Sequence, residues 1–261
     1  MKKINNFDEL NKLISMHFKK GVYTNCFVSK EELQEYINKK RLFYTRYDKG
    51  LLIFIKMRGY YNMKYYINDV NCDFRFSNRR KIVTEIAGKT EKSLETIVEF
   101  FKRNQWNIVL NRLRFSCEEP KINESLEIEK IEKLKIKDYA KIIKILRKNY
   151  DKYTGCIPLK ENIKLDIKNG NFYCYKEDNK ILGILHICNK AKKSEMRHLV
   201  VLKECRGKSI AKRLITRYLI DVEEKSKQVW TSTNNEIAKN LFMSLGYEAD
   251  GYVSYVLTNN M

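Results

Sequence analysis

The chain has 261 residues, 43% hydrophobic and 12% aromatic, which is enough apolar material to fill one large core or two ordinary ones. No apolar run approaches the roughly 20 residues that span a bilayer, and the basic start lacks an apolar signal core, so we expect a cytoplasmic protein without a membrane partner. The net charge of +20 favours anionic ligands, but it is spread over both halves, so nucleic acid is not expected as the main ligand.

In the N-terminal half, the spacing of apolar residues predicts alternating helices and strands. Helices are expected at 7–18, 30–38 and 93–104, and strands at 42–47, 51–57, 60–68, 81–87 and 108–117. The polar segment 117–125, which contains Pro120, shows no periodicity. We interpret it as a boundary between two domains, residues 1–120 and 126–261.

The C-terminal half predicts an α/β order as well. Strands are expected near 126–135 and at 171–175, 180–188, 195–202 and 228–231, with a strand pair around 247–257. Helices are expected at 138–150, after Pro158, from 210 to 222 and at 237–245. This order predicts a mixed central β-sheet flanked by helices.

The seven cysteines include no CxxC pair, which indicates buried thiols rather than a disulfide framework or a zinc site. His186 and Cys188 alternate in an expected strand, but no spacing rule connects them to His17 or His198. His198 is interpreted as a core histidine. We therefore expect no metal.

A strand, a short turn and a helix start follow one another between residues 197 and 214. The N–H groups of a first helical turn lack intrahelical partners, and the helix dipole adds positive charge there, so the segment predicts an anion site. Small residues would let a pyrophosphate approach the main chain: Gly207, Ser209 and Ala211. Basic residues strengthen the field: Arg206, Lys208, Lys212 and Arg213.

A Walker A loop is the rival interpretation, because Gly207-Lys208-Ser209 matches the end of that motif. The first glycine of the motif is missing, since Leu202 stands at its position inside the expected strand. A large phosphate-wrapping loop therefore cannot form here.

Two motifs resemble those of the GNAT acetyltransferase superfamily. Arg/Gln-x-x-Gly-x-Gly/Ala is matched by Arg206, Ser209 and Ala211, with serine in place of the usual glycine. Asn-x-x-Ala-x-x-x-Tyr-x-x-x-Gly-Phe is matched by Asn235, Ala238, Phe242, Gly246 and Tyr247, with phenylalanine in place of the usual tyrosine. The resemblance covers residues 126–261 and implies the GNAT fold, with acetyl-coenzyme A as co-substrate.

The resemblance also implies which residues bind the co-substrate. The main chain of a splayed strand would meet the pantetheine arm and the thioester: Leu199, Val200 and Val201. The turn and helix start would hold the pyrophosphate: Arg206, Gly207, Lys208, Ser209, Ile210, Ala211 and Lys212. Asn235 is expected to contact coenzyme A beyond the next strand.

Catalysis is less clearly specified, because Phe242 has no proton to give to the departing thiolate. Tyr247 is the candidate proton donor, with Tyr252 and Tyr255 as alternatives, and Glu195 on the expected strand is the candidate base. The reaction implied is direct transfer of acetyl to a primary amine, on a small molecule or a peptide, in a ternary complex.

The first half resembles the second faintly, since Phe43-Tyr44 corresponds to Phe172-Tyr173 and the pair Phe101 and Trp106 to Phe242 and Tyr247. Two tandem GNAT-like units are therefore expected, the first degenerate or lining the substrate site. The sequence leaves two alternatives open, a non-catalytic acyl-coenzyme A binding regulatory module and a transferase that uses a larger donor such as aminoacyl-tRNA. The oligomeric state is not specified.

Overall fold

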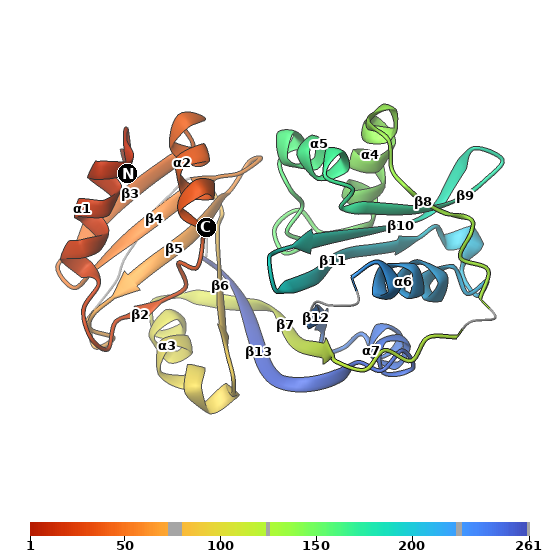
Figure 1. The fold of residues 1–261 in the computed structure, drawn as a ribbon. Coiled ribbons are helices and arrows are strands. Elements are labelled where there is room, and N and C mark those ends of the chain that lie inside the picture. The colour runs from red at the N-terminus through yellow and green to blue at the C-terminus, as the bar shows by residue number, and fades with distance from the viewer. Residues whose placement is uncertain (73–79, 124–125, 223–225, 260–261) are drawn as a thin grey trace. The chain divides into compact units, whose positions relative to one another are not determined.

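A computed structural model describes residues 1–72, 80–123, 126–222 and 226–259, which form two compact units (Figure 1). The first unit contains Met1–Asn111 together with the chain end from Val253, and the second contains Arg112–Tyr252. Strands β7 (Trp106–Cys117) and β13 (Glu248–Asn259) each contribute residues to both units. No helix in the described part of the chain is long and apolar enough to cross a membrane.

The first unit contains a sheet in the order β1-β3-β4-β5-β6-β13, with β2 paired to β5. Its other strands are β1 (Lys2–Lys3), β2 (Tyr23–Thr24), β3 (Leu42–Tyr47), β4 (Gly50–Lys56), β5 (Tyr61–Ile67) and β6 (Ile82–Gly88). Its helices are α1 (Phe7–His17), α2 (Lys30–Asn38) and α3 (Glu91–Arg103). Tyr65 packs against Phe101 of α3, whereas its neighbour Tyr66 joins the apolar cluster of α1 and α2, so both faces of this sheet are covered.

Each helix in the described part of the first unit follows a residue whose side chain accepts a hydrogen bond from the first helical turn. Asn6 caps α1, Ser29 caps α2 in a capping box, and Thr90 caps α3 in the same way. The orphan N–H groups at these helix starts are therefore partly satisfied within the chain.

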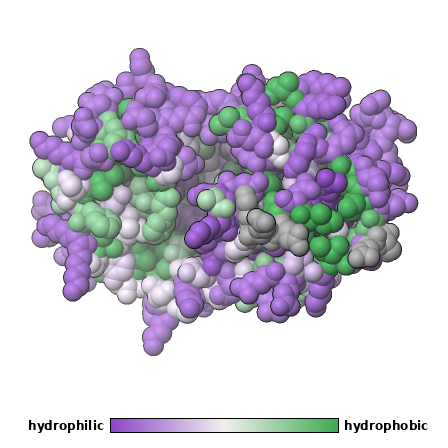
Figure 2. All heavy atoms as spheres, in the orientation of Figure 1, coloured by the Kyte–Doolittle hydropathy of each residue, from purple (hydrophilic) through white to green (hydrophobic). Residues whose placement is uncertain are grey.

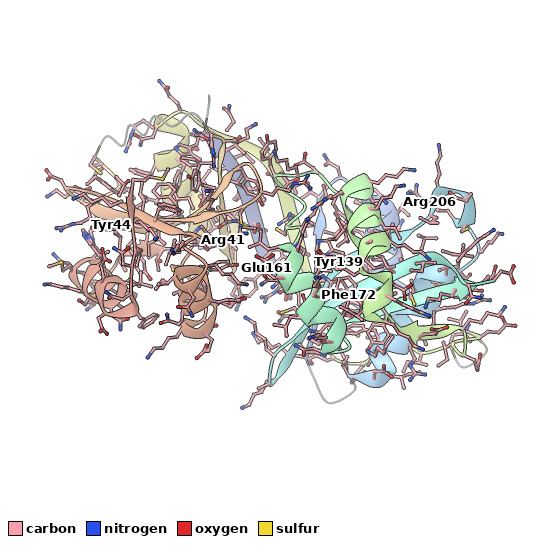
Figure 3. The ribbon with its side chains drawn as sticks, turned by 90° about the horizontal axis from the view of Figure 1, so that it is seen from above. Arg41, Tyr44, Tyr139, Glu161, Phe172 and Arg206 are labelled. Carbon is pink, nitrogen blue, oxygen red and sulfur yellow. The ribbon has the colours of Figure 1, made fainter. Side chains whose placement is uncertain are left out.

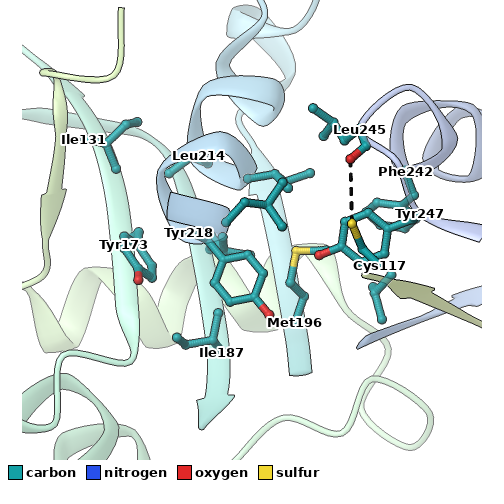
Figure 4. Close-up of a cluster of buried hydrophobic side chains, with 14 of the residues drawn as sticks. Cys117, Ile131, Tyr173, Ile187, Met196, Leu214, Tyr218, Phe242, Leu245 and Tyr247 are labelled. Atoms are coloured by element: carbon teal, nitrogen blue, oxygen red, sulfur yellow. Dashed lines mark hydrogen bonds between the residues drawn. The ribbon is translucent and has the colours of Figure 1, made fainter. Parts of the chain in front are cut away.

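The second unit contains a sheet in the order β7-β12-β11-β10-β9-β8. Its strands beside β7 are β8 (Ile131–Lys133), β9 (Phe172–Glu177), β10 (Lys180–Asn189), β11 (Lys193–Val201) and β12 (Ser226–Ser232). Helices α4 (Tyr139–Asn149) and α5 (Lys160–Lys168) cover one face, and α6 (Ile210–Asp221) and α7 (Glu236–Met243) cover the other. Figure 4 shows part of the apolar cluster between the sheet and α6 and α7.

The expected strand pair around 247–257 is wrong, because the segment is the single strand β13. Asp250-Gly251 is a hairpin signal in the sequence, but here the Asp250 carboxylate accepts hydrogen bonds from the Tyr252 N–H and from Arg114 Nε of β7, and Gly251 takes a φ of 82° within the strand. The strand expected near 126–135 is confined to β8, and β1 and β2 were not expected.

Polar and charged side chains dominate the surface on the face drawn in Figure 2. They agree with the net charge of +20 and with the spread of basic residues along the chain. The positive charge is therefore spread over the surface and is not confined to one site.

Candidate functional site

Strand β11 contains a bulge at Arg197. On β10, His186 is opposite His198 and Ile187 is opposite Met196, so Arg197 has no partner residue there. The extra residue changes the face of the sheet to which the following side chains point. Met196, before the bulge, belongs to the cluster under α6, whereas Val200, four residues later, belongs to the cluster under α4 and α5. A bulge of this kind bends the strand and changes its direction.

Beyond the bulge, β11 separates from β12. The two strands pair in parallel from Lys193 opposite Ser226 to Met196 opposite Val229, and the pairing ends there. Strand β12 continues to Ser232 along β7 on its other side. The main chain of β11 from Arg197 to Val201 therefore has an edge without a partner strand, and the predicted residues Leu199, Val200 and Val201 lie on it. We call the place where β11 and β12 separate, beyond Met196 and Val229, the opening.

Tyr150, immediately after α4, places its hydroxyl on this edge. The Leu199 N–H donates to the Tyr150 hydroxyl at 2.9 Å, and the hydroxyl donates to the Leu199 carbonyl at 3.1 Å. Burial raises the pKa of Tyr150 to about 12, so the phenol keeps its proton near neutral pH. The sequence did not single out Tyr150, which stands 49 positions before Leu199.

The turn between β11 and α6 has the geometry of an anion site. Gly207 and Ser209 both adopt left-handed conformations, with φ of 80° and 57°, and α6 begins at Ile210. No side chain caps α6, and the first helical bond runs from the Arg213 N–H to the Ser209 carbonyl. The earlier N–H groups of this turn are thus available to an external acceptor, in contrast to the capped helices of the first unit.

The basic residues of this segment differ in their surroundings. Arg206, Lys208 and Lys212 are exposed, and Arg206 is labelled beside the turn in Figure 3. Arg213 is held instead on the side of β9, because it donates to the Tyr175 hydroxyl at 3.1 Å and pairs with Glu127 at 3.5 Å. Three of the four basic residues are therefore placed to strengthen the field at the turn.

Gly183 on β10 brings α6 close to the sheet. A Cβ atom at this position would lie 2.8 Å from the Ile210 side chain, 3.1 Å from Leu214 and 3.3 Å from the Val200 carbonyl. The missing side chain lets the first turn of α6 rest on β10 beside the bulged strand. No spacing pattern in the sequence identifies this glycine.

The carboxylate and hydroxyl proposed for catalysis lie in different surroundings. Glu195 is half-buried on the paired part of β11, and its carboxylate forms an ion pair with Arg197, whose Nε atom lies 2.8 Å from a carboxylate oxygen. Tyr247 is only 1% exposed, in the apolar cluster of Figure 4, and burial raises its pKa. An enclosed hydroxyl of this kind has no path to a substrate in this conformation.

The second motif builds helix α7 and its packing. The Asn235 side chain accepts from the Ala238 N–H at 3.1 Å, so it caps α7. Phe242 is 4% exposed and packs against Phe115 and Tyr247, with ring centroids 6.3 and 5.8 Å away. In this conformation these two residues support the helix, and the contact expected between Asn235 and coenzyme A stays a prediction.

Two histidines form a buried hydrogen-bonded chain under α5. His186 Nε2 lies 3.1 Å from an oxygen of Asp166, the two Nδ1 atoms of His186 and His198 are 2.9 Å apart, and His198 Nε2 lies 2.8 Å from the Gly155 carbonyl. A carbonyl only accepts, so His198 Nε2 carries a proton. His198 is a satisfied core histidine, as expected from the sequence.

The contacts of these two histidines show which of their ring nitrogens carry protons. Burial lowers the pKa of His198 to about 3, so its ring is neutral and its Nδ1 accepts from His186. The remaining contact, between His186 Nε2 and Asp166, then needs one proton shared between an imidazole nitrogen and a carboxyl oxygen. Asp166 also accepts from the Asn171 amide at 3.1 Å. Within the described residues, no group of three or more His, Cys, Asp or Glu side chains is arranged to hold a metal ion.

A family model described as "Acetyltransferase (GNAT) domain" matches residues 168–249, which include β9 to β12, the uncapped turn and α7. The match thus covers the bulged strand and the turn that define the candidate site. A comparison with curated proteins gives no match.

Solved structures show the same fold over a longer range. An acetyltransferase of the GNAT family from Colwellia psychrerythraea aligns with a TM-score of 0.59 at 12% identity, covering 100% of this chain and 99% of that one. A GCN5-related N-acetyltransferase from Sphaerobacter thermophilus aligns with a TM-score of 0.58 at 10% identity, covering 89% and 86%. One from Kribbella flavida aligns with a TM-score of 0.56 at 10% identity, covering 88% and 93%. These likenesses confirm the expected fold, and they extend to the N-terminal half.

Proposed function

We propose that this chain, which carries a GNAT acetyltransferase domain over residues 168–249, is an N-acetyltransferase that moves acetyl from acetyl-coenzyme A to a primary amine. The observation that carries the proposal is the coincidence of two features on one strand. Strand β11 opens away from β12 after Met196, and the same strand leads through Ser209 into the uncapped start of α6. An opening suits a thioester, and an uncapped helix start suits a pyrophosphate.

In the proposed chemistry, a main-chain N–H of β11 stabilises the charge that develops on the thioester oxygen. A neutral amine attacks the thioester carbonyl carbon, and the carbonyl oxygen gains negative charge in the tetrahedral intermediate. The Leu199 N–H, on the unpaired edge, would stabilise that charge. The carbonyl then re-forms, coenzyme A leaves as the thiolate, and the amine loses its extra proton to a base.

Glu195 remains the proposed base, acting directly or through water. Its carboxylate is half-buried two residues before the bulge, and its contact with Arg197 fixes its position. The structure offers no equivalent support for Tyr247 as proton donor, because its hydroxyl is enclosed. A coenzyme A thiolate can leave without a resident acid near neutral pH, with water as the proton source.

The acceptor class proposed is a primary amine on a small molecule or a peptide, with transfer in a ternary complex and in the cytoplasm. The tandem arrangement, with a first unit that has lost the coenzyme site, is part of the same proposal. Its support is the difference in helix starts, since helices α1, α2 and α3 of the first unit are capped by side chains and α6 is not.

Thiol release from acetyl-coenzyme A in the presence of a broad panel of amines is the direct test. We expect release that depends on both the amine and acetyl-coenzyme A. Tight binding of acetyl-coenzyme A with no release for any amine would contradict the proposal and favour a non-catalytic acyl-coenzyme A binding module.

The binding stoichiometry is a separate prediction. Calorimetric titration with coenzyme A should give one site per chain, because only the α6 start joins an open strand to an uncapped turn within the described residues. Two equivalent sites per chain would contradict the assignment of a single coenzyme site to the second unit. A matched titration with pantetheine should give weak binding, because pantetheine lacks the pyrophosphate of coenzyme A.

A further inference from the structure

The opening beside β11 already contains a side-chain donor. Leu199 uses both its N–H and its carbonyl to bond the Tyr150 hydroxyl, so both groups point away from β10 toward the unpaired edge. The hydroxyl therefore occupies the place that a main-chain partner would have if β11 and β12 stayed together. A ligand oxygen that takes the Leu199 N–H arrives next to the Tyr150 hydroxyl.

We propose that Tyr150 is a catalytic residue that donates its hydroxyl hydrogen to the oxyanion, alongside the Leu199 N–H. The inference rests on the proposed acetyl transfer and goes beyond it by naming the second donor. As the amine nitrogen bonds to the thioester carbon, the carbonyl electron pair moves onto oxygen, where the two donors hold it. When the C–S bond breaks, that pair re-forms the carbonyl and the thiolate departs. Tyr150 keeps its proton throughout.

The surroundings of Tyr150 favour hydrogen bonding over proton transfer. Burial raises its pKa to about 12, so the phenol is a weaker acid than an ordinary tyrosine. Such a group donates a hydrogen bond at neutral pH and does not ionise in the process. This property suits an oxyanion donor and does not suit the general acid that Phe242 lacks.

The ring of Tyr150 is held from two sides. Its main-chain N–H donates to the Leu146 carbonyl at 2.9 Å, which fixes the residue to the end of α4. Its ring meets the His198 ring edge to face, with centroids 4.7 Å apart, and His198 is in turn bonded to the Gly155 carbonyl. A donor with a fixed ring is preorganised for charge that develops during the reaction.

The alternative is that Tyr150 merely closes the opening in the absence of ligand. In that case the hydroxyl competes with acetyl-coenzyme A for the Leu199 N–H, and its removal strengthens binding without slowing the reaction. An oxyanion donor behaves differently, because its contribution is made in the transition state and appears in kcat. The two roles are therefore separated by the effect on kcat and on KM.

The experiment compares Tyr150→Phe with the wild-type enzyme, using an amine for which the wild type releases thiol. We expect kcat to fall roughly 100-fold, as on loss of one oxyanion donor, with the Kd for coenzyme A within about threefold of the wild-type value. Tyr139→Phe is the matched control, because Tyr139 is the first residue of α4, the helix that Tyr150 follows, and no role at the opening is assigned to it (Figure 3). Its kcat should stay within about twofold.

Three results decide the inference. An unchanged kcat in Tyr150→Phe, with or without tighter coenzyme A binding, overturns it and leaves the proposed function intact. A higher KM for acetyl-coenzyme A without a fall in kcat also overturns it. An inactive wild type across the whole amine panel contradicts the proposed function itself. The melting temperatures of the two variants show whether both are folded under the assay conditions. If the melting temperature falls in Tyr150→Phe alone, the kinetic comparison is made at a lower temperature, at which all three proteins are folded.

Discussion

Replacement of Ser209 by glutamate should weaken coenzyme A binding at least about 100-fold, equivalent to the loss of one or two charge-assisted hydrogen bonds. Ser209 immediately precedes α6, and its side chain makes no capping bond, so the proposed pyrophosphate site would consist of main-chain N–H groups and the helix dipole. A carboxylate at this position would add a like charge beside the proposed position of the pyrophosphate and would fill the space that the pyrophosphate needs.

Ser209→Gly is the matched control, because it leaves the same turn without a side chain. Ser209 has a φ of 57°, a conformation that costs most L-residues roughly 1–2 kcal/mol and costs glycine nothing. Glycine loses more backbone entropy on folding, by roughly 0.5–1 kcal/mol, so the net change in stability should be small and favourable. Coenzyme A affinity should be equal to or better than that of the wild type.

Calorimetry with coenzyme A measures both variants. An affinity in Ser209→Glu equal to that of the wild type would place the pyrophosphate elsewhere and remove the turn from the site. Melting curves of both variants establish that any loss of binding is local.

The turn could be predicted from the sequence because its residues are contiguous. An apolar strand, a small-residue turn and an amphipathic helix follow one another between 197 and 214, and each is recognised by local spacing. The expected helix from 210 to 222 and the expected strands at 171–175 and 180–188 correspond closely to α6, β9 and β10. The expected helices at 7–18 and 30–38 likewise correspond to α1 and α2.

The parts that could not be predicted depend on pairing between distant segments. The bulge at Arg197 exists only in the register of β11 against β10, and its own sequence resembles an ordinary alternating strand. The contact of Tyr150 with Leu199 joins a residue after α4 to a strand 49 positions later. Tyr247 is a candidate proton donor by its place in a motif, but its burial depends on tertiary packing that a motif does not specify. The site thus lies on predictable elements, but its donors are selected by tertiary structure.

The buried histidines provide a second prediction, on stability. Asp166→Ala should reduce the free energy of unfolding by about 1–3 kcal/mol, because it leaves the buried His186 Nε2 without a partner. Asp166→Asn should stay within about 0.5 kcal/mol of the wild type, because its amide can supply both contacts. The Asn oxygen can accept from Asn171, as Asp166 does now, and the Asn nitrogen can donate to His186.

Urea unfolding with an unchanged slope measures both free energies. The comparison tests how protons are placed in the hydrogen-bonded series of Asp166, His186 and His198. The asparagine side chain always provides the proton that the contact between His186 and Asp166 needs. Equal losses in the two variants would show that the carboxylate charge, paired with an imidazolium at His186, matters more than the hydrogen bond. A loss in Asp166→Ala alone would show that His186 is neutral at neutral pH, in agreement with the effect of burial, which lowers its pKa against the opposing effect of Asp166.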